Sequence, residues 1–231
     1  MKPDAVNNPA LEPDHLMLAA HRGNVELLRG ALVDPQPHIR ALAISGLSKL
    51  GALSDSEATA AAQDPDRLVR HRVAQLGATD QRIDLLTLLG DPDFAVAETA
   101  AWALGERHES RDADQPDGSI LDALVLAALI ESAETHPHQL VRESCIAALG
   151  AIGDPRGLPT ILAGCDDKPA VRRRAVLALA PFEGEEVDRA LANALSDRDW
   201  QVRQAAEDLL GVGQTNTSAV ATDFTTDVAK T

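Results

Sequence analysis

Two histidines and two cysteines are the side chains best suited to chemistry in this sequence. His136 and His138 flank a proline, and Cys145 follows them in the chain. Imidazole and thiolate groups bind zinc, but a zinc site needs three or four ligands that converge. Nothing in this spacing makes the three converge, so we expect no metal site. Cys145 and Cys165 are the only cysteines, and we expect both to be free thiols because the chain shows no export signal.

Motifs for covalent or cofactor chemistry are missing from the sequence. It contains no glycine-rich phosphate loop, no G-x-S-x-G elbow and no Cys-x-x-Cys pair. We therefore expect no catalytic residues and no cofactor. Catalytic residues can also lie far apart in a sequence, so an enzyme is kept as the alternative reading.

The sequence has one basic run, Arg172-Arg173-Arg174. Guanidinium groups bind carboxylates and phosphates through pairs of hydrogen bonds. Arg173 and Arg174 are therefore candidates for contact with an acidic peptide or a phosphate group. The alternative is a solvated surface on which Glu143 and Asp208 balance the two charges, as surface charges usually do nothing specific.

The chain as a whole is acidic. It has 21 Lys and Arg residues against 36 Asp and Glu residues, a net charge of −15. General nucleic-acid binders present a basic surface, so we expect no nucleic-acid partner. No apolar run reaches the length of a membrane span, and residues 1–9 lack the apolar core of a signal peptide. We expect no membrane association and a cytoplasmic location.

An internal repeat organises these residues. The unit is Asp-Pro-x-x-x-Val-Arg-x-x-Ala-x-x-x-Leu-Gly, counted from the Asp as position 0, and it recurs about every 30 residues. The fourth copy starts later than this period allows, and the excess falls on the polar segment 106–118, which we interpret as an inserted loop. The copies start at Asp34, Asp64, Asp91, His136, Asp166 and Asp197.

Each copy predicts a pair of helices. The apolar residues at +5, +9 and +13 follow helical spacing and mark the second helix. We expect the Asp to be its N-cap, the Pro to be its first residue and the Gly to be its C-cap. Apolar residues before each Asp, as in 83–89, 121–130 and 187–195, mark the first helix. The low aromatic content, 2%, fits small-residue helix packing, and the sequence predicts an all-α fold.

The repeat resembles the short HEAT-like repeats, about 30 residues long, that are named after phycobilin (PBS) lyase subunits. The resemblance covers about residues 15–211. It implies an α-α superhelix, a right-handed solenoid of about six helix pairs in which each pair packs on its neighbours. Residues 1–14 are expected to be a flexible N-terminus, and residues 212–231, which lack helical periodicity, a disordered tail.

The resemblance also implies a ladder in which the Arg at +6 pairs with the Asp of a neighbouring repeat. The third repeat has Ala97 at the Arg position, and the fourth has His136 at the Asp position. Both members of one rung are therefore missing at the junction that carries the insertion, which we interpret as a softer joint or a widened groove. The expected ladder residues are Asp34, Arg40, Asp64, Arg70, Asp91, Arg142, Asp166, Arg172, Asp197 and Arg203.

Offsets +4, +7, +8 and +11 define the exposed side of the second helices, which lines the concave surface of a HEAT-like solenoid. Trp102 stands out on it, because tryptophan is enriched at binding hot spots, although it could equally pack under the inserted loop. Phe94 and Trp200, at +3, are expected to pack between repeats. The same offsets place Ala41, Thr99 and Ala205 in solvent. The candidate partner-binding residues are Trp102, Glu98, His71, Arg72, Glu143, Arg173, Arg174 and Leu177.

These features favour a non-enzymatic scaffold or adaptor, monomeric, that binds a protein partner through its concave face. The alternative is an enzyme or enzyme subunit of the phycobilin-lyase or deoxyhypusine-hydroxylase-like type, since both families use similar repeats. The hydroxylase family binds two irons through several His-Glu pairs. Here there is one such pair, His108-Glu109, inside the predicted loop, so those residues cannot be carried over. HEAT-like DNA glycosylases need a basic groove that this acidic chain lacks.

Overall fold

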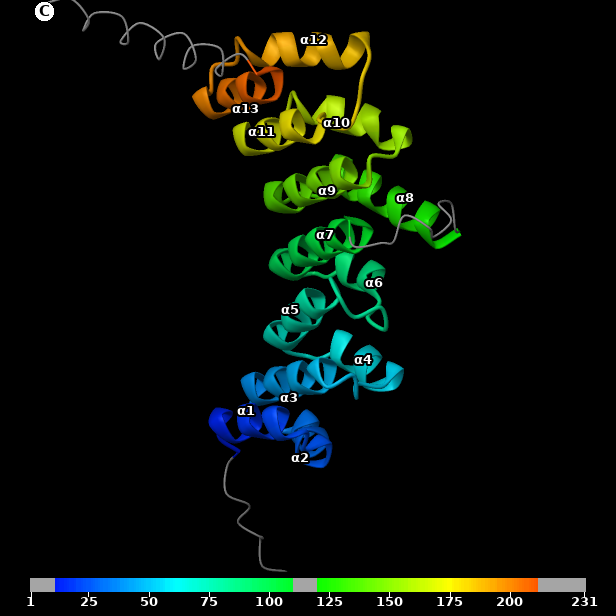
Figure 1. Cartoon of the computed structure of the whole chain (residues 1–231), viewed down its shortest axis with the longest axis vertical. Helices are drawn as coiled ribbons and strands as arrows, with labels where there is room; N and C mark the ends of the chain where they lie inside the picture. The colour runs from blue at the N-terminus through cyan, green and yellow to red at the C-terminus, as the bar shows by residue number, and fades with distance from the viewer. Residues whose placement is uncertain (1–10, 110–119, 212–231) are drawn as a thin grey trace, which may run out of the picture. The chain divides into compact units, whose positions relative to one another are not determined.

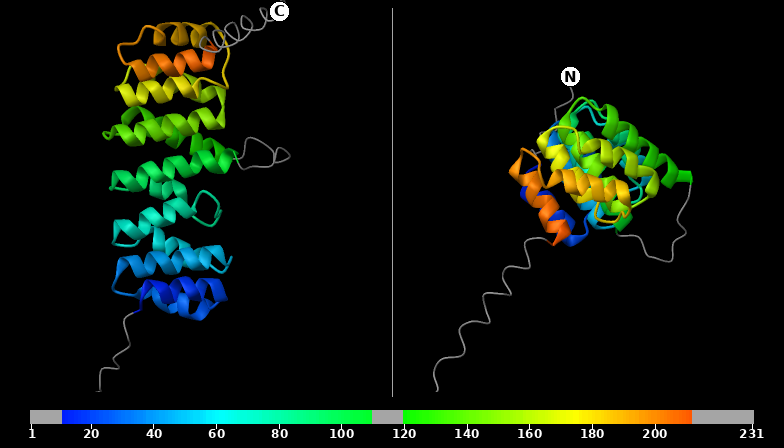
Figure 2. Two further views of the ribbon diagram at one scale, coloured as in Figure 1. Left: turned by 60° about the vertical axis from the view of Figure 1, so that its left-hand side comes forward. Right: turned by 90° about the horizontal axis from the view of Figure 1, so that it is seen from above.

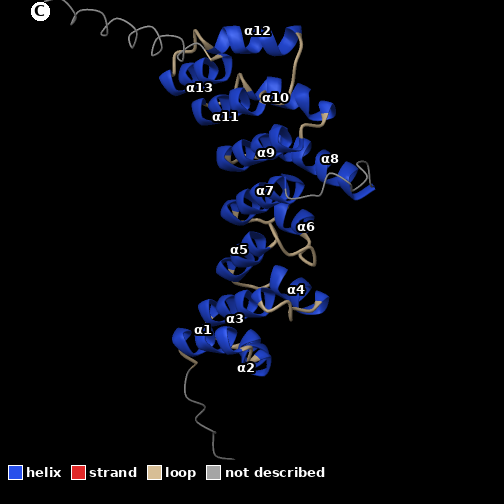
Figure 3. Cartoon of the chain, viewed as in Figure 1, coloured by secondary structure: helices blue, strands red, loops and turns tan. Residues whose placement is uncertain are grey.

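The computed structural model describes residues 11–109 and 120–211. Over these residues the chain forms α-helices and two short 3-10 helices, and no strand (Figure 3). The predicted all-α fold is confirmed. No helix in the described segments is long and apolar enough to span a membrane. The predicted C-terminal tail and most of the predicted N-terminus and inserted loop lie outside the described residues.

The chain divides into two compact units, Met1–Ser110 and Arg111–Thr231. The division falls within the insertion, at the junction where both members of one ladder rung are missing. Each unit is built from helix pairs, as the repeat predicts. We describe the two units separately and call them unit 1 and unit 2.

Unit 1 consists of two helical layers (Figure 1). The helices α1, α3, α5 and α7 pack on one another in that order and form the first layer, while α2, α4 and α6 form the second. In Figure 2 the first-layer helices lie side by side, from blue to green. The elements are α1 (Pro13–Arg22), α2 (Val25–Gly30), η1 (Ala31–Val33), α3 (Pro37–Lys49), α4 (Asp55–Ala62), α5 (Arg67–Leu76), α6 (Leu85–Leu89) and α7 (Phe94–Glu109).

Unit 2 has the same two-layer arrangement. The helices α9, α11 and α13 pack on one another, and α8, α10 and α12 form the other layer (Figure 1). The packing of α9 against α11 and of α8 against α9 is the most extensive in this unit. The elements are α8 (Ile120–Thr135), α9 (Gln139–Ile152), η2 (Pro155–Gly157), α10 (Leu158–Gly164), α11 (Pro169–Ala178), α12 (Glu185–Ala194) and α13 (Trp200–Leu210).

The core follows the register that the repeat predicts. The residues at +5 and +9 are 0–1% exposed in every repeat, because these positions face the neighbouring helices. The apolar residue near the end of the second helix, at +12 or +13, is less buried in two repeats. Leu76 is half-buried, and Leu210, on the terminal helix α13, is 45% exposed. The buried set is Ile39, Ala43, Val69, Val73, Val96, Ala100, Val141, Cys145, Val171, Ala175, Val202 and Ala206.

The predicted helix starts were wrong by two residues. The Asp at position 0 is not the N-cap: α5 begins at Arg67 with Asp66 as N-cap, and α13 begins at Trp200 with Asp199 as N-cap. The Pro at +1 therefore lies in the turn before the helix. The position-0 carboxylate instead accepts the backbone N–H of residue +2, as Asp64 does from Asp66 at 2.8 Å. This bond shapes the turn that leads into the helix.

The glycines at the ends of the second helices have two different roles. Gly211 caps α13 with φ +67°, as predicted. Gly150, however, lies inside α9, where a Cβ would stand 2.7 Å from the Cβ of Ala178 on α11. Gly77 likewise leaves room for Leu85, whose Cδ2 would clash with an added Cβ. At these two positions glycine allows close helix packing rather than a left-handed cap.

The predicted loop 106–118 was wrong at its start, because α7 continues to Glu109. Arg107 therefore belongs to a helix, and its guanidinium reaches back to the segment between α5 and α6. It donates to the carbonyl oxygens of Gly77, Asp80 (2.8 Å) and Ile83 (2.7 Å). The pair His108-Glu109 also lies on α7 rather than in a loop. The rest of the predicted loop falls outside the described residues.

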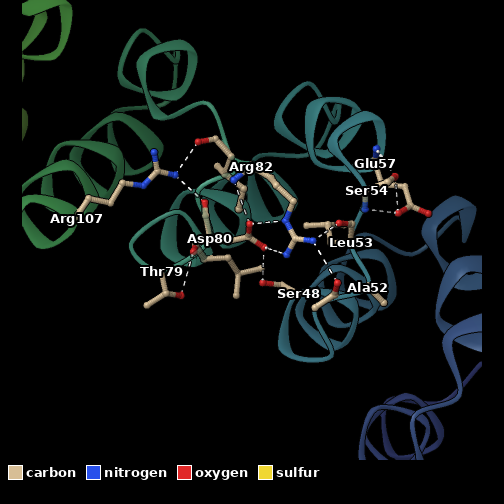
Figure 4. Close-up of polar contacts among 12 residues, drawn as sticks. Ser48, Ala52, Leu53, Ser54, Glu57, Thr79, Asp80, Arg82 and Arg107 are labelled. Carbon is tan, nitrogen blue, oxygen red and sulfur yellow. Dashed lines mark hydrogen bonds and ion pairs between the residues drawn. The ribbon is translucent and has the colours of Figure 1, made fainter. Parts of the chain in front are cut away.

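A polar network joins the segment between α5 and α6 to α3, the second helix of the preceding repeat (Figure 4). The Asp80 carboxylate, on a residue only 7% exposed, accepts two hydrogen bonds of 2.7 Å from Arg82 and one of 2.9 Å from Ser48 on α3. Arg82 also donates to the carbonyl oxygen of Leu53. Burial raises the pKa of Asp80, but these hydrogen bonds outweigh it and leave the pKa below its ordinary value. The network links two repeats of unit 1.

Candidate partner-binding face

The Asp–Arg ladder is present and has one geometry. Each guanidinium meets a carboxylate of the next repeat through two parallel hydrogen bonds, from Nε and Nη2, of 2.6–3.0 Å. Its Nη1 donates to a carbonyl oxygen at the start of its own repeat, as Arg40 does to Asp34 at 2.8 Å. The rungs are Arg40–Asp64 and Arg70–Asp91 in unit 1, and Arg142–Asp167 and Arg172–Asp197 in unit 2.

One predicted ladder residue is replaced by its neighbour. Arg142 pairs with Asp167 at 2.7 and 2.8 Å, not with Asp166, which is exposed. The turn of this repeat is one residue shorter, since Arg172 donates to the carbonyl of Asp167, five residues before it, whereas Arg40 donates six residues back. A double Asp at the turn left the two choices indistinguishable in the sequence.

The rungs are partly buried and lower the pKa of their carboxyl groups. The rung side chains are 5–24% exposed. The hydrogen bond from Arg142 holds the pKa of Asp167 below its ordinary value, and the hydrogen bond from Arg172 does the same for the pKa of Asp197. The pKa of Arg172 is raised, and the hydrogen bond to Asp197 is again the largest cause.

At His136, which stands in the position-0 place of Asp, one of the two contacts of that Asp is kept: the backbone hydrogen bond within the turn. Its Nδ1 accepts the backbone N–H of His138 at 3.1 Å, the bond that the carboxylate makes in other repeats. His138 in turn is the N-cap of α9, and its Nδ1 accepts the N–H of Leu140 at 3.4 Å. Both imidazoles therefore shape a turn. Within residues 11–109 and 120–211, no three side chains of His, Cys, Asp or Glu gather in a way that could hold a metal ion.

Both cysteines are free thiols, as predicted. Cys145 is fully buried in the core, and burial raises the pKa of its thiol to about 12. Burial also raises the pKa of Cys165, to about 11. Thiols with such pKa values carry little thiolate at neutral pH and are poor nucleophiles.

The exposed side of the second helices is narrower than predicted. Ala41, Thr99 and Ala205 were expected in solvent, but they are only 4%, 6% and 5% exposed. All three lie at +7 or +8 on second helices that pack side by side within their units. Small side chains at these positions let the neighbouring second helix cover them.

In unit 1 the exposed side of α5 and α7 carries large apolar groups. Trp102 on α7 is 45% exposed and Leu68 on α5 is 47% exposed. Arg72 is exposed, and His71 and Glu98 are half-buried. Because α5 packs on α7, these five residues lie on adjacent helices of one layer. We call them the unit 1 face.

Phe94 and Trp200, which were predicted to pack between repeats, are more exposed than that prediction implies. Phe94 is 42% exposed and Trp200 is 64% exposed. Each is the first residue of its helix, α7 and α13 respectively.

In unit 2 the arginine pair and Glu143 come together. Arg173 and Arg174 lie 3.9 and 3.7 Å from the carboxylate of Glu143 on α9, as the solvated-surface alternative requires. The Nε of Arg174 is buried and makes no hydrogen bond. The second predicted counter-charge, Asp208, instead accepts a hydrogen bond from Gln204. Leu177 (36% exposed) and Leu140 (41%) lie on the same two helices.

Sequence reasoning missed Arg107, Asp80 and Asp167. The first two make contacts outside the repeat unit, so the spacing that revealed the ladder carries no sign of them. Asp167 is a neighbour of the residue that the repeat alignment selects. The exposed residues of α1, Met17 (59%) and Leu18 (42%), were also missed, because the first recognisable repeat starts at Asp34.

Comparisons with known proteins agree with this architecture. A family model described as HEAT repeats matches residues 126–211. The structure of YibA from Escherichia coli matches with a TM-score of 0.61 at 17% sequence identity, covering 96% of this chain and 80% of that one. No curated protein matches by sequence. At this identity the structural likeness shows the fold alone.

Two further solved structures are less similar. Computationally designed armadillo repeat proteins for modular peptide recognition match with a TM-score of 0.46 at 15% identity, covering 86% of this chain and 85% of theirs. Human deoxyhypusine hydroxylase in complex with glycerol matches with a TM-score of 0.35 at 18% identity, covering 88% and 99%. Neither likeness is close enough to support a functional argument. The repeat unit, the stacked helix pairs and the match of the HEAT-repeat model to residues 126–211 together support a HEAT-like helical-repeat fold.

Proposed function

We propose that this chain is a non-enzymatic scaffold or adaptor that binds a protein partner through the exposed side of its second helices. The observation that carries the proposal is the exposure of Trp102, which is 45% exposed on a helix whose other side is buried. Exposed tryptophan on a rigid helix is a typical anchor of a protein interface, because it buries a large area with little loss of side-chain entropy.

The residues around Trp102 favour a partner surface that combines apolar side chains with charged side chains. Leu68 offers further apolar surface, and Arg72 and Glu98 carry charges of opposite sign. An apolar centre with a charged rim is the usual anatomy of a protein interface. The face belongs to helices fixed by packing and by the Arg70–Asp91 rung, so little ordering cost is expected on binding.

In unit 2, we propose Leu177, Leu140 and the arginine pair as a second contact region. The carboxylate of Glu143 lies beside both guanidinium groups at 3.7–3.9 Å, longer than a hydrogen bond. An acidic side chain of a partner would form shorter bonds to the same groups.

The test is affinity capture from the native host with the full chain as bait, read by mass spectrometry. Wild type, Trp102→Ala and Trp200→Ala are compared, so that both variants remove an exposed tryptophan. We expect a protein captured by wild type and by Trp200→Ala that Trp102→Ala loses. Recovery of the same proteins by all three baits, with Trp102→Ala shown to be folded by circular dichroism, would refute the unit 1 face.

A further inference from the structure

Unit 2 contains a groove between α10 and α12, the first helices of two successive repeats. Its volume is about 540 Å³, within the range of small-molecule binding sites. The first helices α8 and α10 pack on each other, but α12 does not pack closely on α10. The α12 residues that line the groove include Ala190 and Ala194, whose side chains are too small to fill the space between the two helices.

The floor of the groove is apolar. Val176 on α11 and Val202 on α13 line it and are each 1% exposed, and Leu162 on α10 adds a half-buried side chain. Cys165 also lines the groove, and its thiol is neutral at pH 7 because burial raises its pKa to about 11. A floor of this kind favours an aliphatic ligand, because binding removes apolar surface from water.

Two carboxylates lie at opposite ends of the groove. The helices α10 and α12 run in the same direction (Figure 1). Glu186 lies in the first turn of α12, and Asp166 lies just beyond the end of α10. From Glu186 to Asn193, the lining residue near the other end of α12, the helix rises about 10 Å. The two carboxylates are therefore separated by a distance of this order.

These two carboxylates carry the uncompensated charge of the groove. Neither side chain forms a hydrogen bond or an ion pair with any described residue. The other charged residues of the lining are paired: Asp197 is held by Arg172 in a ladder rung, and Arg189 donates to Glu185 at 2.7 Å. The groove is therefore complementary to a ligand with two cationic groups and an apolar middle.

We propose that the groove between α10 and α12 is a binding site for a linear aliphatic diamine. Both amines of such a ligand are protonated at neutral pH. The alkyl chain lies on the apolar floor, and one ammonium group meets Asp166 while the other meets Glu186. The site belongs to the layer of first helices, so it does not depend on partner binding through the exposed side of the second helices.

The test is calorimetric titration of the full-length protein with three amines. Octamethylenediamine is long enough, when extended, to reach both carboxylates. Octylamine has the same alkyl chain but one ammonium group, and putrescine has two ammonium groups on a chain too short to reach both ends. We expect octamethylenediamine to bind more tightly than either of the other two, because it alone makes both ion pairs and the apolar contact.

Two pairs of variants locate the site. Glu186→Gln and Asp166→Asn should each weaken the binding of octamethylenediamine by about threefold to fivefold, the effect of one exposed ion pair. The matched controls, Glu183→Gln and Asp188→Asn, remove exposed carboxylates that do not line the groove. They should leave the affinity at the wild-type value. Amide NMR signals of α10 and α12 should shift during the titration.

Four results would overturn the proposal. Equal weakening by the groove variants and their controls would indicate only a general attraction of cations to an acidic chain. Equal affinities for octylamine and octamethylenediamine would mean that the carboxylates do not act as a pair. Amide shifts confined to other helices would place the ligand elsewhere, and a wild-type protein that binds none of the three amines has no such site.

Discussion

Arg172 and Asp197 meet through two parallel hydrogen bonds, Nε to Oδ2 at 2.8 Å and Nη2 to Oδ1 at 2.7 Å, although 25 residues separate them. The same guanidinium donates to the carbonyl of Asp167 at 2.9 Å, and the same carboxylate accepts the N–H of Asp199 at 2.7 Å. One ion pair thus connects the turns that precede α11 and α13, the second helices of two successive repeats. The ladder fixes how neighbouring repeats stack, and so fixes the surface that they expose.

We predict that Arg172→Lys destabilises the protein by about 2–3 kcal/mol, because an ammonium group cannot make the paired bonds and leaves a partly buried carboxylate poorly satisfied. Arg172 is only 6% exposed. Chemical denaturation measures the free energy of unfolding. The control is Arg173→Lys on the same helix, for which we expect a change below about 0.5 kcal/mol. Equal effects of the two substitutions would contradict a structural role for the rung.

The ladder also predicts acid sensitivity. The pKa values of Asp167 and Asp197 are lowered in the folded chain by their arginine partners. Groups of this kind contribute stability that is complete above their unfolded pKa, about 4, and is lost as the pH falls through the folded pKa. The free energy of unfolding should therefore decrease as the pH is lowered below about 4.

Asp197→Asn isolates the part of this effect that belongs to one rung. The variant should be less stable than wild type at pH 7. The difference should shrink as the pH falls below about 4, the unfolded pKa, because the unfolded wild type binds the proton more readily than the paired carboxylate of the folded chain. Urea denaturation at pH 7 and at pH 3 gives the measurement. A stability difference that is the same at both values would mean that the ion pair does not titrate as described.

Gly150→Ala should destabilise unit 2 by about 1–3 kcal/mol. The added Cβ would lie 2.7 Å from the Cβ and 2.8 Å from the Cα of Ala178, so the helices α9 and α11 would have to move apart. Gly30→Ala is the matched control, because nothing lies within 4 Å of its added Cβ. Its φ of −59° is helical, so alanine there should stabilise by about 0.5 kcal/mol. Thermal melts measure both variants. A lower melting temperature for Gly150→Ala alone indicates that Gly150 serves helix packing.

The sequence predicted the helices, the core register and the ladder because each depends on one residue type at a repeated spacing. Val171 and Cys145 could be assigned to the core from offset alone. The helix starts could not, because Asp64 and Asp66 are both good capping residues and only the folded turn shows which one caps. The burial of Ala41 and Thr99 depends on how closely two helices approach, which periodicity does not encode.

Part of the candidate face could be predicted because its residues also lie at repeated offsets. Trp102 and Arg173 sit at offsets that point away from the core, and the structure exposes or half-exposes them. Asp80 and Arg107 lie outside the repeated unit, so no second copy exists to reveal them. Their contacts connect segments 27 residues apart, which only the three-dimensional structure brings together.

Arg107 provides the last prediction. Its guanidinium satisfies the carbonyl oxygens of Gly77, Asp80 and Ile83, and burial lowers its pKa from the ordinary value. In Arg107→Met these carbonyl groups lose their donor, so we expect a loss of about 2–3 kcal/mol in the free energy of unfolding. The effect should be local as well, with faster amide hydrogen exchange in residues 77–84.

The control for Arg107→Met is Glu106→Gln, the exposed neighbour on the same helix. It should leave both the stability and the exchange of residues 77–84 at wild-type values. If Arg107→Met is less stable but its exchange rises evenly over all of unit 1, the residue supports the helix packing in general rather than this segment. If neither quantity changes, the three carbonyl contacts contribute nothing, because water replaces the guanidinium without cost.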